Sequence, residues 1–438
     1  MKKVIQHRPR IEGAIATPGD KSTSHRAALL NSIAEGTAHV SNFCVGDDRA
    51  SMLRVLRGLG VRITRHNACP VSGADECFKV EGRGLDGLVE PTNVLSAGNS
   101  GTTTRLVSGL LAGQSFMSVL TGDGSLRRRP MSRVVKPLTQ MGAKIMGRSK
   151  DTLLPLAIRG GDLKGINYTV PMASAQVKSC VLIAGLYAQG TTTVTEPTLS
   201  RDHTERMLRY MGANLKSSGL SHSISRSKLI AKDIAVPGDT SSAAFWLVAG
   251  AVHPNARITL RNIGINPTRT GVIKVLESMG ARIRMQNVRE SGPETVADIV
   301  VETSELHGTE IRGEIIPHVI DELPVLSLAA ALAKGKTVIA DAEELRVKES
   351  DRINATAVGL NALGARVEEQ GDGMVIYGGA KLKGAAVKSY GDHRIAMTMG
   401  IAGVIATGRT TIDGAEAASV SYPLFWDTLQ SLTMGGLQ

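Results

Sequence analysis

Met141-Gly142-Ala143 is one of five similar tripeptides that each close a helix-like segment and open a strand-like one. The others are Leu59-Gly60-Val61, Met211-Gly212-Ala213, Met279-Gly280-Ala281 and Leu363-Gly364-Ala365. Their glycines are 82, 70, 68 and 84 residues apart, which indicates a structural repeat of about seventy to eighty residues. A single glycine after a helix is commonplace, but five such glycines at similar spacings predict a chain built from repeats.

The repeats share an order of predicted elements: a turn of small residues, an apolar helix, a glycine, a β-branched strand, a second helix and a further strand. In the first repeat this order predicts helices over 22–34 and 48–59, with Gly36 as the first helix's C-cap and a strand at 37–40. In the third and fourth repeats it predicts helices over 174–186, 202–211, 240–252 and 268–279, with strands at 191–194 and 258–260. A sixth copy begins near Tyr390 and lacks the closing tripeptide.

Six repeats divide naturally into three plus three. Thr17-Pro18-Gly19-Asp20 opens the first repeat and Val236-Pro237-Gly238-Asp239 opens the fourth. Because 438 residues exceed one ordinary core, we expect two α/β lobes, one of residues 18–234 and one of residues 1–17 plus 235–438. The second lobe is discontinuous only if the first residues pair with the second half, which the sequence leaves open.

The formal net charge of +11 indicates an anionic partner. The basic residues are dispersed and aromatic residues make up only 3% of the chain, a composition that argues against a base-stacking nucleic-acid surface. We therefore expect small anions rather than nucleic acid.

The four cysteines, Cys44, Cys69, Cys77 and Cys180, form no CxxC pair and no His/Cys metal spacing. We expect reduced thiols and neither a metal nor a cofactor. The N-terminus carries two lysines without an apolar stretch, and no uninterrupted membrane-length apolar segment occurs. A cytoplasmic protein without a membrane partner is expected.

Pro18-Gly19-Asp20-Lys21-Ser22 is a turn that feeds a helix, where backbone N–H groups and the helix dipole favour an anion. Ser22 and Arg26 are four residues apart, so a hydroxyl and a guanidinium share one helix face and can hold one phosphate. The alternative is an ordinary N-cap with a surface lysine and arginine. The spaced glycines of a Walker A loop are missing.

Other helix starts repeat this arrangement. Ser96–Arg105 places small residues and amide donors at a predicted start. In Arg127-Arg128-Arg129 only the last arginine is a plausible ligand, and the other two are expected to be solvated. Ser174-Ala175-Gln176 and Arg201-Asp202-His203 open the two helices of the third repeat. Equivalent starts can converge on one ligand, although simple capping also explains Ser174.

The second half carries a comparable set of charges. Asp321-Glu322 precedes an apolar helix predicted over 325–332, and capping explains one acid but not both. The next predicted helix start carries several charges close together, in Lys348-Glu349-Ser350-Asp351-Arg352. The alternative interpretation of these charges is a helix face exposed to solvent. Asp392-His393-Arg394 adds a cation in the last repeat.

Taken in order, these segments resemble the 5-enolpyruvylshikimate-3-phosphate synthase family, across essentially the whole chain. The resemblance implies an α/β fold of two lobes, each of three βαβαββ units, with the active site in the cleft between them. It also implies transfer of the enolpyruvyl group from phosphoenolpyruvate to the 5-hydroxyl of shikimate 3-phosphate, with release of phosphate. This reaction belongs to chorismate and aromatic amino acid biosynthesis, and a monomer is expected.

The family's site residues carry over motif by motif. The set implied around shikimate 3-phosphate is Lys21, Ser22, Arg26, Ser174, Ala175, Gln176, Arg201, Asp321 and Lys348. The set implied around phosphoenolpyruvate is Lys21, Asn99, Gly101, Arg129, Gln176, Glu349, Arg352 and Arg394.

The implied reaction needs two acid–base groups. The 5-hydroxyl loses a proton as it attacks C2, and C3 gains one, which gives a tetrahedral intermediate that expels phosphate. The expected groups are Asp321 for the hydroxyl proton and Glu349 for C3. Lys21 is expected to stabilise the departing phosphate.

Two positions bear on family subgroups. Many relatives carry a lysine shortly before the terminal Phe-Pro, whereas this chain reads Ser419-Val420-Ser421-Tyr422-Pro423. The family is the target of glyphosate. At position 101 this chain has the glycine found in glyphosate-sensitive members. The sequence of residues 170–179 is closer to a subgroup that includes glyphosate-insensitive members. Both sensitivity and insensitivity to glyphosate therefore stay open.

Two other functions share some of these sequence features. The sister transferase that acts on a UDP-linked amino sugar, UDP-N-acetylglucosamine enolpyruvyl transferase, shares the fold but commonly carries a reactive loop cysteine. An RNA-binding or RNA-end-processing protein would suit the positive charge, but the dispersed charge and few aromatics count against it.

Overall fold

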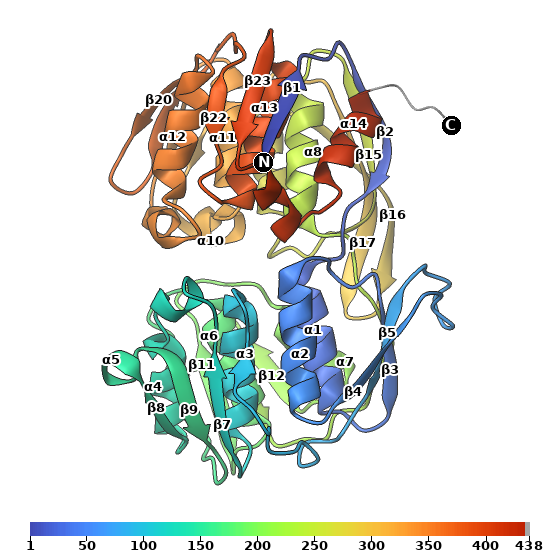
Figure 1. Cartoon of the computed structure of the whole chain (residues 1–438), viewed down its shortest axis with the longest axis vertical. Helices are drawn as coiled ribbons and strands as arrows, with labels where there is room; N and C mark the ends of the chain where they lie inside the picture. The colour runs from blue at the N-terminus through green and yellow to red at the C-terminus, as the bar shows by residue number, and fades with distance from the viewer. Residues whose placement is uncertain (434–438) are drawn as a thin grey trace. The chain divides into compact units, whose positions relative to one another are not determined.

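The computed structural model of the protein describes residues 1–433 (Figure 1). Its contacts divide the chain into two compact parts. Residues 19–237 with 290–294 are called the N-terminal lobe, and residues 1–18, 238–289 and those from 295 onwards the C-terminal lobe. The sequence places the passages between lobes after residues 17 and 234, and the contacts place them after Pro18 and Pro237.

The N-terminal lobe contains three four-stranded sheets. Its strands are β3 (Thr37–Ser41), β4 (Arg62–His66), β5 (Cys77–Glu81), β6 (Leu95–Ser96), β7 (Met117–Thr121), β8 (Lys144–Gly147), β9 (Leu153–Arg159), β10 (Asn167–Thr169), β11 (Thr191–Thr195), β12 (Leu215–Ser218), β13 (Ser221–Ser225) and β14 (Ile234–Ala235). Its helices are α1 (Lys21–Ser32), α2 (Asp47–Gly58), α3 (Gly101–Ala112), α4 (Ser132–Gln140), α5 (Arg148–Asp151), α6 (Ala175–Gly185) and α7 (His203–Tyr210), with the 3-10 turn η1 (Leu126–Arg128). The strand orders are β14-β3-β5-β4, β6-β7-β9-β8 and β10-β11-β13-β12.

The C-terminal lobe contains three further sheets. Its strands are β1 (Lys2–Gln6), β2 (Ile11–Ala16), β15 (Ala256–Gly264), β16 (Arg282–Ser291), β17 (Glu294–Glu302), β18 (Glu310–Ile311), β19 (Lys336–Ile339), β20 (Arg366–Glu369), β21 (Met374–Tyr377), β22 (Ala386–Lys388) and β23 (Arg409–Asp413). Its helices are α8 (Thr240–Val252), α9 (Gly271–Ser278), α10 (Ile316–Val319), α11 (Leu323–Leu332), α12 (Arg352–Ala362), α13 (His393–Ile405) and α14 (Phe425–Thr433), with 3-10 turns η2 (Gly313–Ile315), η3 (Glu343–Val347) and η4 (Ala415–Val420). The strand orders are β16-β17-β15-β2, β18-β19-β21-β20 and β1-β23-β22.

The sheet of the second repeat shows the common pattern. β6 runs parallel to β7, β7 is antiparallel to β9, and β9 is antiparallel to β8. Since the chain order is β6-α3-β7-α4-β8-β9, with only the short α5 inserted before β9, the repeat is a βαβαββ unit. The predicted fold class is confirmed.

Three strands pair with a repeat that lies elsewhere in the sequence. β14, which follows the third repeat, pairs in parallel with β3 of the first, and Ile234 lies opposite Val40. β2, which precedes the first repeat, pairs in parallel with β15 of the fourth, and β1 is antiparallel to β23 of the last. The first residues therefore pair with the second half of the chain, which answers the question that the sequence left open.

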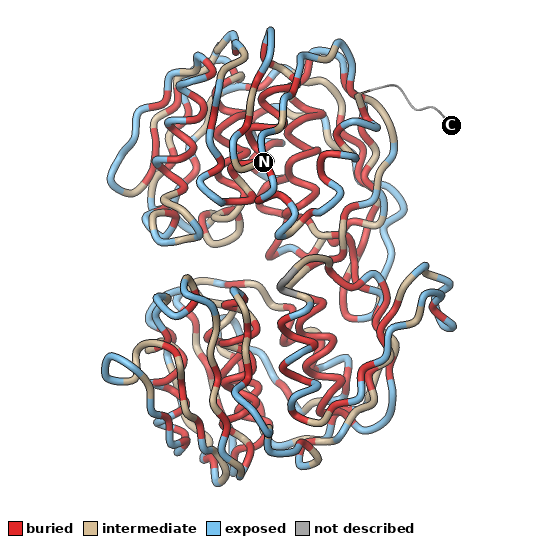
Figure 2. Tube along the Cα trace, in the orientation of Figure 1, coloured by how far each residue is buried: buried red, intermediate tan, exposed pale blue. Residues whose placement is uncertain are grey.

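The core of each lobe is built around three inner helices. These are α1, α3 and α6 in the N-terminal lobe and α8, α11 and α13 in the C-terminal lobe, each buried along most of its length (Figure 2). Apolar and small residues lie all round most of these helices, which is the pattern of a helix enclosed by its neighbours. α1 is the polar exception, and two of its buried polar side chains bond to backbone: Ser32 Oγ donates to the Leu29 carbonyl (2.6 Å), and Asn31 Oδ1 accepts from the Lys232 N–H (3.0 Å).

The repeated tripeptides close the outer helices. Gly60, Gly142, Gly212, Gly280 and Gly364 follow α2, α4, α7, α9 and α12, and their φ angles lie between +83° and +111°. This left-handed backbone conformation favours glycine. The apolar residue before each glycine is fully buried. The tripeptide therefore reverses the chain and anchors the helix end to the core.

Predicted boundaries were shifted at three places. α1 ends at Ser32 with Ile33 as its C-cap, so the assignment of Gly36 as C-cap was wrong; Gly36 lies in the following turn, at φ +106°. α9 begins at Gly271 rather than 268, because Asn266 Oδ1 accepts a bond from the Thr268 N–H (2.9 Å) and holds a turn there. α11 begins two residues earlier than predicted, at Leu323.

Among the described residues, no single helix is both long and apolar enough to cross a membrane, and one pair, 313–319 with 323–332, meets that test only together and is bent by 112°.

The closing glycines predict a measurable conformational cost. A methyl group at Gly212 would meet no atom within 4 Å, so Gly212→Ala tests backbone conformation alone, at φ +91°. It should lower the free energy of unfolding by about 1–2 kcal/mol, measured by urea denaturation. Gly371→Ala, in equally open space but without a positive φ, is the control; equal effects of the two variants would contradict the explanation.

Candidate active site

The turn before α1 places Lys21 at a helix start. Gly19 is required there because a Cβ would lie 1.7 Å from the Asn42 carbonyl oxygen. Asp20 is the N-cap, and its carboxylate accepts a bond from the Thr23 N–H (2.7 Å). Lys21 is thus the first residue of α1 and is partly exposed. The helix dipole and the lysine charge act together at this point.

Arg26, one turn further along α1, is buried, with 2% of its surface exposed. Its Nη1 donates to the Ser22 carbonyl (2.9 Å), its Nη2 to Ser179 Oγ (2.8 Å) and its Nε to Thr204 Oγ1 (2.5 Å). Arg26 therefore joins α1 to α6 and α7. Ser22, which the sequence pairs with Arg26 on one helix face, is bonded through its carbonyl rather than its hydroxyl.

The charge of Arg26 survives this burial. Burial lowers the pKa of Arg26 to about 10, and the carboxylates of Glu205 and Asp20 oppose the shift. The group is still protonated at neutral pH. Arg26 therefore places a buried positive charge close to the start of α1.

The starts of α3 and α6 are linked by Arg105. Its Nη1 donates to Gln176 Oε1 (2.5 Å), and Gln176 Nε2 donates to Thr102 Oγ1 (3.0 Å). Gly101, the first residue of α3, lies against this arginine, because a Cβ there would come within 3.1 Å of Arg105 Nη1. Arg105 stands in the predicted segment, but its link to Gln176 spans 71 residues and no local pattern indicates it.

Arg129 and Asn99 also come together. Arg129 follows η1, and its Nη2 donates to Asn99 Oδ1 (2.9 Å), while Asn99 Nδ2 donates to Asp123 Oδ2 (2.6 Å). Arg127 and Arg128 are exposed, as expected of solvated charges. The loop after β7 therefore presents one arginine beside the start of α3.

Ser174 and Arg201 lie at the starts of α6 and α7. Ser174 is the N-cap of α6 and accepts a bond from the Val177 N–H (3.4 Å), so capping accounts for its hydroxyl. Ala175 is the first helical residue. Arg201 directly precedes Asp202, the N-cap of α7, and is partly exposed.

In the C-terminal lobe, Arg352 gathers three carboxylates at the start of α12. Its side chain is 2% exposed, and its guanidinium contacts Asp321 Oδ1 (3.2 Å), Glu349 Oε2 (2.7 Å) and Asp392 Oδ2 (2.8 Å). Burial alone would lower the pKa of Arg352, but the carboxylates outweigh it and raise the pKa above its ordinary value. Burial alone would raise the pKa of Asp392, and the Arg352 charge instead brings it below the usual range.

Arg394, in the first turn of α13, contacts the backbone of Asp321. Its Nη1 donates to the Asp321 carbonyl (2.8 Å) and lies 3.4 Å from Glu322 Oε1. Lys348 is paired with the carboxylate of Glu344 (3.1 Å). Asp321 thus contacts one arginine through its carboxylate and another through its carbonyl.

The predicted residues therefore fall into two groups. The N-terminal lobe carries Lys21, Ser22, Arg26, Asn99, Gly101, Arg129, Ser174, Ala175, Gln176 and Arg201 at or beside the starts of α1, α3, α6 and α7. The C-terminal lobe carries Asp321, Lys348, Glu349, Arg352 and Arg394 at the starts of α11, α12 and α13. No arginine or lysine follows Arg409 in the sequence, so the segment around Val420 supplies no cation.

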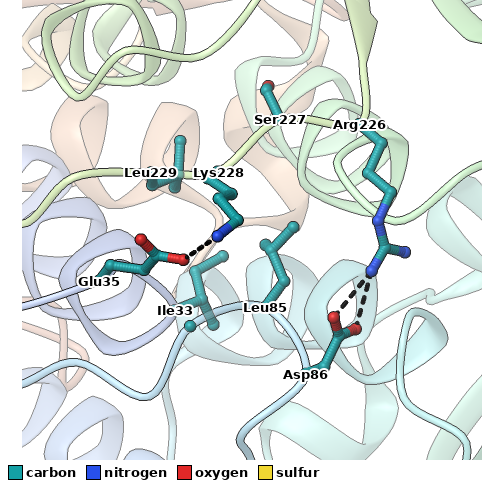
Figure 3. A pocket seen from close by; sticks show the side chains of 9 residues that line it. Ile33, Glu35, Leu85, Asp86, Arg226, Ser227, Lys228 and Leu229 are labelled. Atoms are coloured by element: carbon teal, nitrogen blue, oxygen red, sulfur yellow. Dashed lines mark hydrogen bonds and ion pairs between the residues drawn. The ribbon is translucent and has the colours of Figure 1, made fainter.

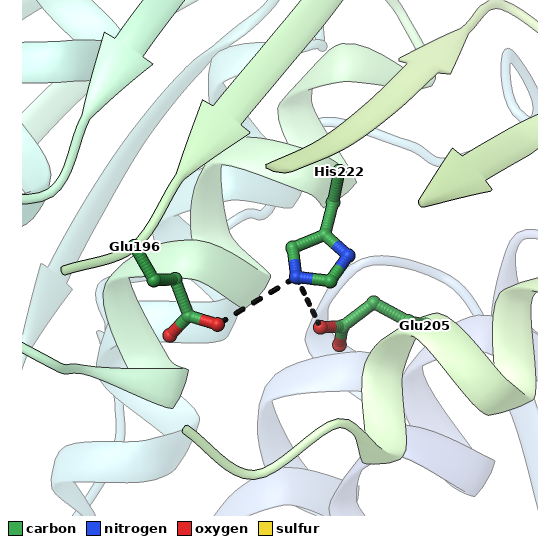
Figure 4. Close-up of side chains that lie close together, drawn as sticks. All are labelled: Glu196, Glu205 and His222. Carbon is green, nitrogen blue, oxygen red and sulfur yellow. Dashed lines mark ion pairs between the residues drawn. The ribbon is translucent and has the colours of Figure 1, made fainter. Parts of the chain in front are cut away.

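Sequence reasoning missed a buried charged cluster behind the start of α6. Lys178 Nζ lies 2.5 Å from Glu196 Oε1 and 2.6 Å from Glu205 Oε1, and all three side chains are at most 1% exposed. His222 Nε2 lies 3.6 Å from each of these oxygens, and Figure 4 shows Glu196, Glu205 and His222 turned toward one another. Burial alone would raise the pKa of Glu196, but hydrogen bonding to His222 and the Lys178 charge lower it.

Glu196, Glu205 and His222 are also the one group among the described residues that offers three metal-ligand atoms within 4.8 Å of one another. Glutamate and histidine are common metal ligands. Here the Lys178 ammonium already pairs with both carboxylates, so a divalent cation would have to displace it.

A surface pocket lies elsewhere on the N-terminal lobe. Two ion pairs cross it, Glu35 with Lys228 (2.7 Å) and Asp86 with Arg226 (2.8 Å), and Ile33 lines it (Figure 3). Ile33 is the C-cap of α1, whereas Lys21 is at the other end of that twelve-residue helix, about 18 Å away. None of the predicted site residues lines this pocket.

Comparison with known proteins identifies the family of the chain. The model of the EPSP synthase (3-phosphoshikimate 1-carboxyvinyltransferase) family matches residues 5–429. The chain belongs to the EPSP synthase family. A 3-phosphoshikimate 1-carboxyvinyltransferase of Bacillus cereus is 53% identical over 423 residues, which cover 96% of this chain and 97% of the relative.

Solved structures agree with the family. EPSP synthase from Acinetobacter baumannii has a TM-score of 0.88 and 44% identity, over 99% of this chain and 98% of that one. The enolpyruvyl transferase NikO from Streptomyces tendae has a TM-score of 0.77 over 98% of this chain and 96% of that one. Its 18% identity limits that likeness to the fold.

Removing the buried ammonium should destabilise the N-terminal lobe. Lys178→Met leaves two carboxylates buried without a cation, and breaking a buried pair costs about 3–5 kcal/mol. Urea unfolding at neutral pH should show this loss. The loss should shrink as pH falls below 4.5, because the stability from the lowered pKa of Glu196 is fully present above that ordinary value and is lost as pH falls through the lowered pKa. Lys228→Met, which breaks the exposed pair with Glu35, is the control and should change stability little. Equal effects of both variants would contradict the role of burial.

Proposed function

We propose that the protein transfers the enolpyruvyl group of phosphoenolpyruvate to the 5-hydroxyl of shikimate 3-phosphate and releases inorganic phosphate. Membership of the EPSP synthase family supports this activity. The reaction brings together two phosphates and two carboxylates. Cations placed at helix starts suit such ligands.

The observation that carries the proposal is the position of two carboxylates on one guanidinium. Arg352 holds Asp321 at 3.2 Å and Glu349 at 2.7 Å, and these are the two residues to which the resemblance assigns proton transfer. The fixed guanidinium positions and orients both carboxyl groups. Two positioned acid–base groups are what an addition followed by an elimination requires.

The proposed chemistry has two stages. Asp321 accepts the proton of the 5-hydroxyl as that oxygen bonds to C2 of phosphoenolpyruvate, while Glu349 delivers a proton to C3, and a tetrahedral intermediate results. Glu349 then reclaims a proton from C3 as the C2–O bond to phosphate breaks. Lys21, at the positive end of α1, stabilises the charge on the departing phosphate.

Each of the two substrates is assigned its own set of binding residues. For shikimate 3-phosphate we propose Lys21, Ser22, Ser174, Ala175, Gln176, Arg201, Asp321 and Lys348, together with Arg26. Because the Arg26 side chain is buried and its guanidinium bonds to Ser22, Ser179 and Thr204, the contribution we propose for it is a buried positive charge. For phosphoenolpyruvate we propose Lys21, Asn99, Gly101, Arg129, Gln176, Glu349, Arg352 and Arg394.

The rival functions are less well supported. The family match and the relatives named 3-phosphoshikimate 1-carboxyvinyltransferase do not favour a UDP-N-acetylglucosamine transferase or an RNA-end-processing protein. We further propose a cytoplasmic monomer that binds neither nucleic acid nor membrane. Retention on heparin at moderate salt would count against the nucleic-acid part of this proposal.

The deciding assay measures phosphate release from phosphoenolpyruvate and shikimate 3-phosphate by the purified protein. The wild type should release phosphate only when both substrates are present. Asp321→Ala should slow release by about 10²–10⁴-fold, the usual contribution of a positioned acid–base group. Asp162→Ala removes an exposed carboxylate and should leave the rate unchanged. Absence of phosphate release by the wild type would refute the proposed function.

A further inference from the structure

Glu322 is a buried carboxylate next to Asp321, and no role has so far been assigned to it. Its side chain is 3% exposed. It occupies the N-cap position of α11, but its side chain makes no capping bond to the helix. Helix capping, the usual reason for an acid at this position, therefore does not explain it.

The contacts of Glu322 point to Arg394 instead. Glu322 Oε1 lies 3.4 Å from Arg394 Nη1 and accepts a hydrogen bond from Ser241 Oγ (2.5 Å). The same Arg394 nitrogen donates to the Asp321 carbonyl (2.8 Å). The guanidinium is thus held between two consecutive residues at the start of α11.

A second arginine fixes the serine. Arg269 Nη2 donates to Ser241 Oγ (2.5 Å) and lies 3.3 Å from Asp239 Oδ1. Since the Ser241 hydroxyl accepts from Arg269, its proton is directed at Glu322. A continuous chain of bonds therefore runs through the first turns of all three inner helices of the C-terminal lobe, from α8 through α11 to α13.

One oxygen of the Glu322 carboxylate takes no part in this chain of bonds. Glu322 Oε2 is buried and has no hydrogen-bond partner among the described residues. Burying a charge without full pairing is costly, and a serine or threonine would cap the helix without that cost. The cost is understandable if the negative charge itself is needed to hold the arginine.

We propose that Glu322 is a positioning residue for phosphoenolpyruvate: its carboxylate, fixed by Ser241, holds the Arg394 guanidinium in the orientation that receives the substrate's anionic group. This inference rests on the proposed function, in which Arg394 is a phosphoenolpyruvate ligand. It adds Glu322 and Ser241, which the resemblance does not name. Because neither contacts substrate in this proposal, both act through Arg394.

The test is a set of steady-state measurements with both substrates varied. Glu322→Ala should raise the KM for phosphoenolpyruvate by about tenfold or more, as expected when a charge-assisted bond to a ligand-binding arginine is lost. The KM for shikimate 3-phosphate should change less than about twofold, since the lost interaction serves only one substrate. Glu322→Gln keeps an acceptor oxygen at the same place but removes the negative charge, so it should raise the KM for phosphoenolpyruvate by about threefold, less than Glu322→Ala does.

Ser241→Ala provides a second route to the same answer if Glu322→Ala does not fold. It leaves the carboxylate in place but removes the bond that fixes it, and it should raise the KM for phosphoenolpyruvate by about threefold. In a double-mutant cycle the two alanine variants should be non-additive, because they act on one chain of bonds. Glu305→Ala, which removes an exposed carboxylate paired with Lys334, is the control and should leave both KM values unchanged.

The outcomes separate this inference from the proposed function. A wild type without phosphate release would refute the proposed function. An active wild type whose KM for phosphoenolpyruvate is unchanged in Glu322→Ala, or in Ser241→Ala, would refute the role of Glu322 alone. Equal rises in both KM values would also refute it, because a general distortion of the lobe would then be the cause.

Discussion

The guanidinium of Arg352 is almost completely buried, and a buried cation must be paired or hydrogen-bonded to be stable. Asp321, Glu349 and Asp392 meet this requirement. They come from the start of α11, the segment after η3 and the start of α13. The constraint that stabilises one charge therefore also fixes three helix starts, and it orients the two carboxylates to which we assign proton transfer.

The N-terminal lobe meets the same constraint with neutral and charged partners. Arg26 is held by two hydroxyls and a carbonyl, and it ties the start of α1 to α6 and α7. The ammonium of Lys178, in α6, is held by the carboxylates of Glu196 and Glu205. Because Arg26 and Lys178 are bonded across elements, the helix starts that carry Lys21, Gln176 and Arg201 are fixed before any anion binds. This is the preorganisation that anion binding and phosphate expulsion require.

Much of this arrangement could be predicted from sequence, and the rest depends on contacts between distant residues. Gly60, Gly142, Gly212, Gly280 and Gly364 indicated the repeats because a left-handed helix end demands glycine at a fixed place. The helix starts with Lys21, Ser174 and Asp392 were recognisable because capping is local. Thr204, one of the partners of Arg26, is 178 residues away from it, and Ser241 and Glu322 are 81 residues apart. No local pattern encodes such pairs, and the strand exchange of β2 and β14 is hidden for the same reason.

The central claim is that these helix-start residues divide the two substrates between them, and titration calorimetry with shikimate 3-phosphate alone tests it most directly. Arg201→Met should weaken binding by about tenfold or more, the cost of losing one charge-assisted bond to phosphate. Arg129→Met, in the same lobe but assigned to phosphoenolpyruvate, should bind shikimate 3-phosphate within about threefold of the wild type. Equal weakening by the two variants, or no weakening by Arg201→Met, would contradict the claim.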